Sequence, residues 1–373
     1  MALTKYCFGD LIELSFIRNS EGLYNEDDTI GVNIDKEIRI MKGDSSKKEL
    51  KTFWIVKPGF FVYNPRGSRK LGLGYNDTSN TYITTFNNMI FRVKDSAVGL
   101  LLPQYLFIYL SRKEWDRKAE YLSWGSSTEV FSWDTFCETE IDLPSITVQQ
   151  KYVDIYNSML ANQRCYERGL EDLKLVCDAY IEDLRRKIKP ERIGSYLLES
   201  DKRNDIDLSV SAVRGLATSK EIIATKADMD GVSLKNYKVL LPKQIAYVPD
   251  TSRRGDKISL GFNNSDETYL VSSISIVFGT VQEKLLSDYL MLYLIRAEFD
   301  RYARFNSWGS ARETFSFEDM CDVEIPIPDI KIQKSIADIY NVYIARKEIN
   351  ERLKEQIKKM CPVLIKGALE EGK

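Results

Sequence analysis

The chain has 373 residues, a formal net charge of −2 and 43% hydrophobic residues, values typical of a globular protein and unlike those of a protein that coats nucleic acid indiscriminately. Histidine is absent, which excludes a Ser-His-Asp or Cys-His catalytic site and disfavours the usual zinc sites. No run of about 18 apolar residues offers a membrane span, and the first residues lack the pattern of a signal peptide, so we expect a cytoplasmic protein with no membrane contact.

The first 146 residues show the pattern of a mixed globular domain. Runs of β-branched and aromatic residues predict strands at 53–56, 60–63, 81–85, 89–93 and 139–143. Apolar residues at helical spacing predict a helix over 103–121, which ends at the turn Ser123-Trp124-Gly125-Ser126. We expect the sheet of this domain to be largely antiparallel.

The pattern changes between Val148 and Ile188. Apolar residues recur there every three or four positions and form one narrow seam, which predicts a single helix about 60 Å long. A helix of this length with one apolar seam needs a partner.

The rest of the chain repeats this order. Tyr105–Asn157 matches Tyr289–Asn341 without a gap at an offset of 184, and 26 of the 53 positions are identical. Further strands are predicted at 244–247, 269–271, 274–278 and 323–327, with a helix over 287–305 and a second seamed helix over 332–369.

We therefore predict an α+β chain made by tandem duplication. Its two globular domains are residues 1–146 and 191–330, and its two long helices, residues 147–190 and 331–373, pair as an antiparallel coiled coil in a pseudo-twofold arrangement. Pro362 is expected to kink or end the second helix, and Gly169 to weaken the first. Six cysteines without a Cys-x-x-Cys pair are interpreted as buried, reduced thiols.

A basic loop follows an equivalent proline in each copy and offers the best candidates for DNA contact. Arginine can donate two hydrogen bonds to guanine, and lysine and arginine bind phosphates; a solvated loop is the alternative. The nearby asparagines could pair with adenine, although a turn role is favoured. The candidates are Arg66, Arg69, Lys70 and Asn76 in the first copy, and Arg253, Arg254, Lys257 and Asn263 in the second.

Other repeated residues allow a structural and a functional interpretation. Trp124 and Trp308 are interpreted as hydrophobic anchors between domain and helix, in preference to base stacking. The pairs Tyr156-Asn157 and Tyr340-Asn341 begin the long helices and are candidates for partner contact, although Tyr156 lies in the seam and suits the core equally well.

Motifs for catalysis or cofactor binding are not found. The segment Gly72-Leu73-Gly74 is better explained by a strand or turn than by a cofactor loop, and no nuclease carboxylate cluster repeats. We predict no catalytic residue, metal or cofactor, so that any chemistry comes from a partner.

The order of domain, long helix, domain, long helix resembles the specificity subunit of type I restriction-modification systems. The resemblance rests on a Gly-Ser-x-x-Glu-x-Phe-Ser stretch that leads through a strand to Pro-x-Ile-x-x-Gln. These residues are Gly125, Ser126, Glu129, Phe131, Ser132, Pro144, Ile146 and Gln149, and again Gly309, Ser310, Glu313, Phe315, Ser316, Pro328, Ile330 and Gln333.

The resemblance implies that each globular domain is a target recognition domain for one half of a bipartite DNA site. It also implies that the helices set the spacing and dock two methyltransferase subunits, with restriction subunits as an open further partner, and that the chain is not itself an enzyme. From the residues alone, a coiled-coil adaptor that does not bind DNA and a stand-alone DNA-modifying enzyme stay open as alternatives.

Overall fold

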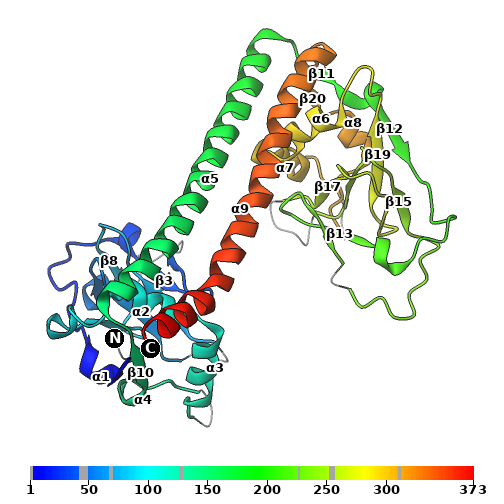
Figure 1. The fold of residues 1–373 in the computed structure, drawn as a ribbon. Coiled ribbons are helices and arrows are strands. Elements are labelled where there is room, and N and C mark those ends of the chain that lie inside the picture. The colour runs from blue at the N-terminus through cyan, green and yellow to red at the C-terminus, as the bar shows by residue number, and fades with distance from the viewer. Residues whose placement is uncertain are drawn as a thin grey trace. The chain divides into compact units, whose positions relative to one another are not determined.

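A computed structural model describes residues 3–41, 49–66, 70–125, 129–225, 227–251, 257–309 and 312–373. The chain forms two compact units (Figure 1): unit 1 comprises Met1–Tyr166 with Ile349–Lys373, and unit 2 comprises Glu167–Glu348. Each long helix begins in one unit and ends in the other. The predicted domain bounds at 146, 190 and 330, which treat the helices as separate segments, stay a prediction.

Unit 1 is built on a four-stranded antiparallel sheet in the order β2-β9-β6-β7, accompanied by three two-stranded antiparallel pairs. The sheet strands are β2 (Ile12–Leu14), β9 (Met89–Val93), β6 (Phe61–Asn64) and β7 (Gly72–Tyr75). The pairs are β1 (Thr4–Cys7) with β10 (Glu140–Leu143), β3 (Ile30–Val32) with β4 (Ile38–Ile40), and β5 (Trp54–Val56) with β8 (Tyr82–Thr84). The predicted strands of the first domain and their antiparallel pairing are confirmed.

Unit 2 repeats this topology strand for strand. Its four-stranded sheet has the order β12-β19-β16-β17, formed by β12 (Leu197–Ser200), β19 (Ile276–Thr280), β16 (Ile245–Tyr247) and β17 (Leu260–Phe262). Its pairs are β11 (Glu191–Arg192) with β20 (Glu324–Ile325), β13 (Arg214–Leu216) with β14 (Ile222–Ala224), and β15 (Lys238–Leu240) with β18 (Tyr269–Val271). The duplication read from the sequence is thus a duplication of the fold.

The short helices also correspond between the units. Unit 1 contains α2 (Pro103–Leu110), α3 (Lys113–Tyr121) and α4 (Trp133–Glu138), which correspond to α6 (Ser287–Leu294), α7 (Ala297–Phe305) and α8 (Phe317–Cys321) of unit 2. The counterpart of α1 (Phe8–Leu11) in unit 2 is a 3₁₀ helix, Ile193–Tyr196. The single helices predicted over 103–121 and 287–305 are each broken in two, because Arg112 and Arg296 adopt an extended backbone with ψ of 149° and 151°. The break begins a new helix whose aromatic residue, Trp115 or Phe299, lies in the core.

Each unit has its own hydrophobic core, and both long helices contribute to each core. In unit 1 the sheet and short helices pack together with Tyr156 of the long helix α5 (Ile146–Lys187) and Ile365 of the long helix α9 (Ile330–Glu371). In unit 2 the equivalent elements pack with Ile181 of α5 and Ile336 of α9. The apolar seams are therefore part of the two cores as well as the contact between helices.

The long helices α5 (Ile146–Lys187) and α9 (Ile330–Glu371) have 42 residues each and run antiparallel within each unit. In unit 1, the Lys151 ammonium lies 2.7 Å from the Glu371 carboxylate, and the Gln163 amide donates to Asn350 Oδ1 at 2.9 Å. In unit 2, the end of α5 packs with the beginning of α9. The predicted antiparallel pairing is confirmed inside each unit.

One expectation about these helices needs correction, and the expected weakening of α5 by Gly169 stays a prediction. Pro362 does not end α9, which continues to Glu371. Gly169 permits a close contact, since a Cβ at this position would lie 2.7 Å from the Arg346 guanidinium.

All six cysteines are free thiols, but only Cys177 and Cys361 are buried. No helix within the described ranges is long and apolar enough to cross a membrane.

A buried glutamine joins the first turn of each long helix to its unit. The Gln149 amide accepts a hydrogen bond from Leu102 N–H at 3.0 Å and donates to the carbonyl oxygens of Leu100 and Pro144. Gln333 makes the same three contacts in unit 2, with Leu286, Lys284 and Pro328. Both side chains are fully buried, which gives the repeated Pro-x-Ile-x-x-Gln stretch a structural role.

Candidate nucleic-acid interface

The basic loops lie at the same end of the two central sheets. In unit 1 the loop connects β6 to β7, and both Arg66 and Lys70 are exposed. In unit 2 it connects β16 to β17, and Lys257 is exposed. Arg69, Arg253 and Arg254 lie outside the described residues. The basic candidates that the structure describes, Arg66, Lys70 and Lys257, are therefore accessible from solvent.

A buried ion pair holds the residue that follows the basic loop in each unit. In unit 1, the Lys36 ammonium lies 2.5 Å from Asp116 Oδ1 and donates to the Leu71 carbonyl. In unit 2, the Lys220 ammonium lies 2.5 Å from Asp300 Oδ1 and donates to the Ile258 carbonyl at 2.8 Å. Asp300 also accepts the Ile258 N–H at 3.1 Å.

The geometry around these lysines supports a positioning role. Lys36 and Lys220 occupy hairpin turns with φ of 64° and 67°, a conformation that costs a non-glycine residue about 1–2 kcal/mol. Burial lowers the pKa of each lysine, and the paired carboxylate opposes that effect. In unit 1 the pair thus connects the hairpin β3–β4, the helix α3 and the end of the basic loop. In unit 2 the equivalent pair connects the hairpin β13–β14, the helix α7 and the end of the basic loop.

The sequence analysis did not predict that these four residues form two ion pairs, although the repeat contains a signal for them. Lys36-Glu37-Ile38 recurs as Lys220-Glu221-Ile222 at the offset of 184 that also relates Asp116 to Asp300. Extension of the repeat towards the amino terminus would have found both pairs. The two partners of each pair lie 80 positions apart in the sequence, so their contact can be seen only in the folded structure.

The two candidate asparagines are buried and form hydrogen bonds inside their units. Asn76 and Asn263 are each 1% exposed. The Asn76 amide donates to the carbonyls of Val56 and Asn80, and the Asn263 amide donates to those of Leu240 and Glu267. Their inclusion among the DNA-binding candidates is therefore corrected: both amides have partners inside the unit, and the turn role accounts for them.

The two repeated tryptophans are not hydrophobic anchors. Trp124 is 78% exposed and Trp308 is 67% exposed. Each begins a short hairpin: Trp124 exchanges backbone hydrogen bonds with Val130, and Trp308 exchanges them with Thr314. The hairpin backbone is held, but the indole ring points to solvent, contrary to the interpretation from the sequence.

The candidates for partner contact divide into core and surface residues. Tyr156 and Tyr340 lie in the cores of units 1 and 2, as the seam position of Tyr156 allowed. Asn157 donates to Gln104 Oε1 at 3.2 Å, and Asn341 approaches Asp288 at 3.5 Å. The tyrosines consequently hold the helices to their units, whereas partner contact by the half-buried Asn157 and Asn341 stays a prediction.

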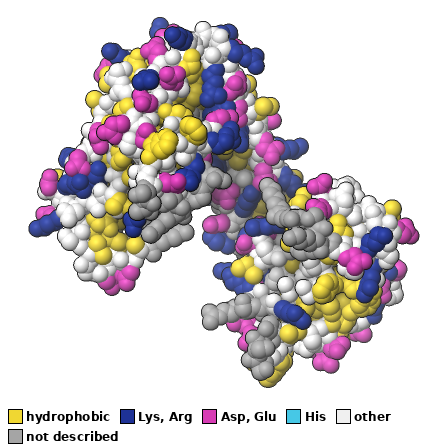
Figure 2. Space-filling view, turned by 180° about the vertical axis from the view of Figure 1, so that it is seen from behind, with side chains coloured by type: hydrophobic (Ala, Val, Ile, Leu, Met, Phe, Trp, Pro, Cys, Tyr) yellow, Lys and Arg dark blue, Asp and Glu magenta, His cyan; other side chains and the backbone are white. Residues whose placement is uncertain are grey.

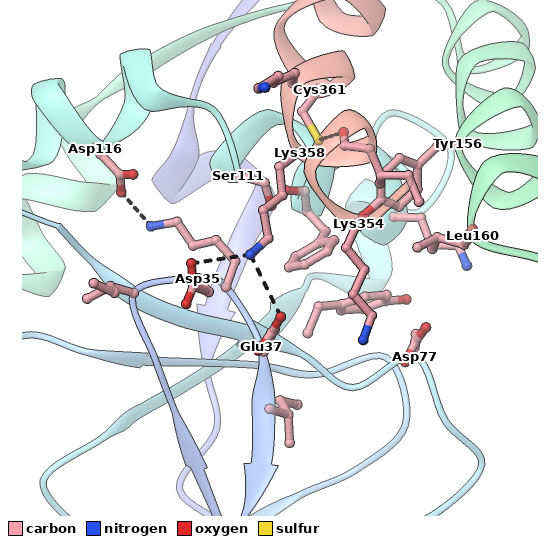
Figure 3. Close-up of a pocket in the computed structure, with 18 of the residues that line it drawn as sticks. Asp35, Glu37, Asp77, Ser111, Asp116, Tyr156, Leu160, Lys354, Lys358 and Cys361 are labelled. Atoms are coloured by element: carbon pink, nitrogen blue, oxygen red, sulfur yellow. Dashed lines mark hydrogen bonds and ion pairs between the residues drawn. The ribbon is translucent and has the colours of Figure 1, made fainter. Parts of the chain in front are cut away.

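A cavity of about 1250 Å³ lies in unit 1, lined by the hairpin β3–β4 and by residues of α2, α3, α5 and α9 (Figure 3). Tyr156, Leu160 and Cys361 form part of its wall. Near them, the Lys358 ammonium lies 3.2 Å from Asp35 and 3.8 Å from Glu37. Because carboxylates face this lysine, the cavity does not have the uncompensated positive charge expected of a phosphate site.

The molecular surface mixes both signs of charge. On the face drawn in Figure 2, lysine and arginine side chains alternate with aspartate and glutamate over both units. This distribution agrees with the formal net charge of −2. It favours DNA contact at specific loops over binding by a uniformly basic surface.

Comparisons with known proteins agree with this architecture. Residues 252–359 match the family model of the type I restriction modification DNA specificity domain. The fold is similar to the crystal structure of the type I restriction-modification system S subunit from M. genitalium, with a TM-score of 0.60 and 12% sequence identity, over 99% of this chain and 96% of that one.

Two further solved structures are more distant. One comes from work on complex assembly and conformational transition of the type I R-M system (TM-score 0.44, 13% identity, 97% of both chains). The other is the HsdS subunit from Thermoanaerobacter tengcongensis (TM-score 0.36, 12% identity, 99% of this chain and 96% of that one). The search of curated proteins found no match.

The matched domain covers the carboxyl-terminal part of unit 2, from the basic loop into α9. The duplication extends the same pattern to unit 1, in which all the strand pairings recur. The M. genitalium subunit has this fold over nearly its whole length. Residues 252–359 thus match the type I restriction modification DNA specificity domain, and the chain as a whole has a fold similar to that of the type I S subunit from M. genitalium.

Proposed function

We propose that this chain is the DNA-specificity subunit of a type I restriction-modification complex and that each unit reads one half of a bipartite, gapped site. The observation that carries this proposal is the repeated topology, which places a basic loop at the same end of the sheet in both units. Two copies of one reader, free to diverge in their loops, suit a target made of two different halves.

The basic loops would supply two kinds of contact. Arg66, Lys70 and Lys257 can neutralise phosphates, and Arg69, Arg253 and Arg254 are the candidates for guanine contact. The buried pairs Lys36–Asp116 and Lys220–Asp300 hold the loop ends and would keep these side chains in register with the DNA. The chain reads the sequence under this proposal, and methyltransferase subunits supply the chemistry.

The double variant Arg253→Ala/Arg254→Ala tests the assignment of one loop to one half-site. It should relax recognition of a single half-site and leave the other unchanged. If both side chains bind phosphates, the slope of log K against log salt should also become shallower by about two. Binding to duplexes with each half randomised in turn measures both effects.

Lys189→Ala is a suitable control for that experiment, because Lys189 is exposed but lies outside the basic loop. It should change neither half-site. Loss of both half-sites together in the Arg253/Arg254 variant would contradict the assignment. Absence of salt-dependent binding by the parent complex would instead favour an adaptor that does not bind DNA.

We further propose that the exposed faces of α5 and α9 dock two methyltransferase subunits. Val176 and Tyr180 are one turn apart on α5 and are 41% and 48% exposed, although both are large and apolar. Aromatic side chains that stay exposed in a free subunit are frequent anchors of protein interfaces. This patch is a better candidate for partner contact than the buried Tyr156 and Tyr340.

The variant Val176→Ser/Tyr180→Ser should weaken binding of the methyltransferase subunit by about tenfold or more. Titration of purified methyltransferase subunit against the chain would measure this. Glu171→Ala is the matched control, since Glu171 is exposed on another face of the same helix. Equal affinity of the double variant and the control would rule out this face as the dock.

A further inference from the structure

Each unit exposes two large aromatic side chains beside its basic loop. In unit 1 they are Tyr121 and Trp124, which are 83% and 78% exposed; in unit 2 they are Phe305 and Trp308, which are 78% and 67% exposed. The pairs are equivalent at the offset of 184. Burial of such a side chain typically contributes about 1.5–3 kcal/mol to folding, so repeated exposure of an aromatic pair is a feature that folding does not explain.

Backbone hydrogen bonds connect these aromatics to the basic loops. Trp124 pairs with Val130, and the next residue, Phe131, donates its N–H to the carbonyl of Pro65, where the basic loop of unit 1 begins, at 2.9 Å. In unit 2 Phe315 donates to the Pro249 carbonyl at 2.9 Å. The tryptophan hairpin and the basic loop are therefore neighbouring parts of one surface in both units.

The hairpin geometry keeps the tryptophan at this surface. Gly125 and Gly309 follow the tryptophans with φ of 154° and 142°, values that other residues rarely adopt. A Cβ at Gly309 would overlap the Arg312 carbonyl oxygen. An ion pair between Arg304 and Glu313 also links the end of α7 to the hairpin.

Cationic side chains precede each aromatic pair. Arg117 and Arg301 are exposed and lie one turn before Tyr121 and Phe305 on the same helices, and Arg117 also lies 3.5 Å from the exposed Glu114 carboxylate. An arginine beside exposed aromatic rings can bind a phosphate while the rings contact the apolar part of the nucleotide. This combination fits DNA better than it fits an apolar protein surface.

We propose that Tyr121 with Trp124, and Phe305 with Trp308, form an aromatic contact with DNA in each unit, which packs against deoxyribose or against a base unstacked from the duplex, next to the phosphates bound by the basic loop. This inference rests on the proposed DNA-reading function. Because deoxyribose is the same at every position and every unstacked base has a face for stacking, the contact adds affinity at both half-sites without selecting a sequence. Sequence selection stays with the basic loops.

The test uses the chain in complex with its methyltransferase subunits and a fluorescent duplex that carries both half-sites. Trp124→Ser and Trp308→Ser should each weaken binding by roughly 5- to 150-fold, the range expected for loss of one stacking contact. The slope of log K against log salt should not change, since no cation is removed. Trp308→Phe should retain most of the affinity, and the unfolding midpoint of all variants should equal that of the parent.

The possible failures are distinguishable. If the serine variants bind the duplex as tightly as the parent, while the parent discriminates its site from unrelated DNA, the stacking contact is refuted and the reader function stands. If the variants lose the methyltransferase subunits while the isolated chain keeps its affinity for DNA, the aromatic pairs are a protein dock and the inference is overturned. If the parent complex itself does not discriminate its site from unrelated DNA, both the proposed function and this inference are refuted.

Discussion

Asp300→Ala is expected to lower the free energy of unfolding of unit 2 by about 3–5 kcal/mol, because it leaves a buried lysine without its counter-charge. The side chains of Lys220 and Asp300 are 5% and 10% exposed. The substitution also removes the acceptor of the Ile258 N–H. Denaturant unfolding, combined with hydrogen exchange read separately for the amides of each unit, would measure the loss and locate it.

Two controls separate the buried pair from charge in general. Asp183→Ala breaks an exposed pair with Lys187 on α5 and should change stability by at most about 1 kcal/mol. Lys220→Met with Asp300→Leu replaces both charges by apolar groups and should recover much of the lost stability. Because the pair holds the end of the basic loop, this double variant should still weaken recognition of one half-site. A loss below about 1 kcal/mol in Asp300→Ala would contradict the positioning role.

Lengthening both long helices by four residues is expected to widen the gap between the two half-sites by about two base pairs. Four residues add about 6 Å to a helix, and DNA rises about 3.4 Å per base pair. Insertion after Tyr166 and after Glu348, where the chain passes from one unit to the other, preserves the packing inside each unit. The methylation motif of cells that carry the variant reports the gap directly.

The same four residues inserted into α5 alone provide the control. The two helices then differ in length, and we expect reduced methylation in place of a clean change of the gap. An active double insertion that methylates the original motif would rule out the helices as the element that sets the spacing.

Much of the fold was predictable because the same pattern of residues occurs twice in the sequence. A strand such as Met89–Val93 or a helix such as Ile146–Lys187 has local periodicity, and the equivalent segment in the other copy supports the same interpretation. The interruption of 103–121 at Arg112 was not predictable, because the apolar spacing continues through it. A change of ψ at one residue leaves little trace in a hydrophobic pattern.

The site was harder to predict, because exposure depends on the tertiary structure. A tryptophan in a repeated motif is usually buried, so the sequence favours Trp124 and Trp308 as hydrophobic anchors between domain and helix, whereas the structure places both in solvent. Asn76 and Asn263 resemble base-reading residues in sequence, yet the fold encloses them. The partners Lys220 and Asp300 lie 80 positions apart, a separation at which no local pattern joins two residues.

A map of adenine methylation in the host genome, with and without the gene for this chain, tests most directly whether the chain reads a bipartite site. Long-read sequencing gives both half-sites and the gap in one measurement. A two-part, gapped motif that disappears on deletion and returns on complementation is the predicted result. A methylation pattern that is the same with and without the gene, in cells that contain the methyltransferase subunits, would contradict it.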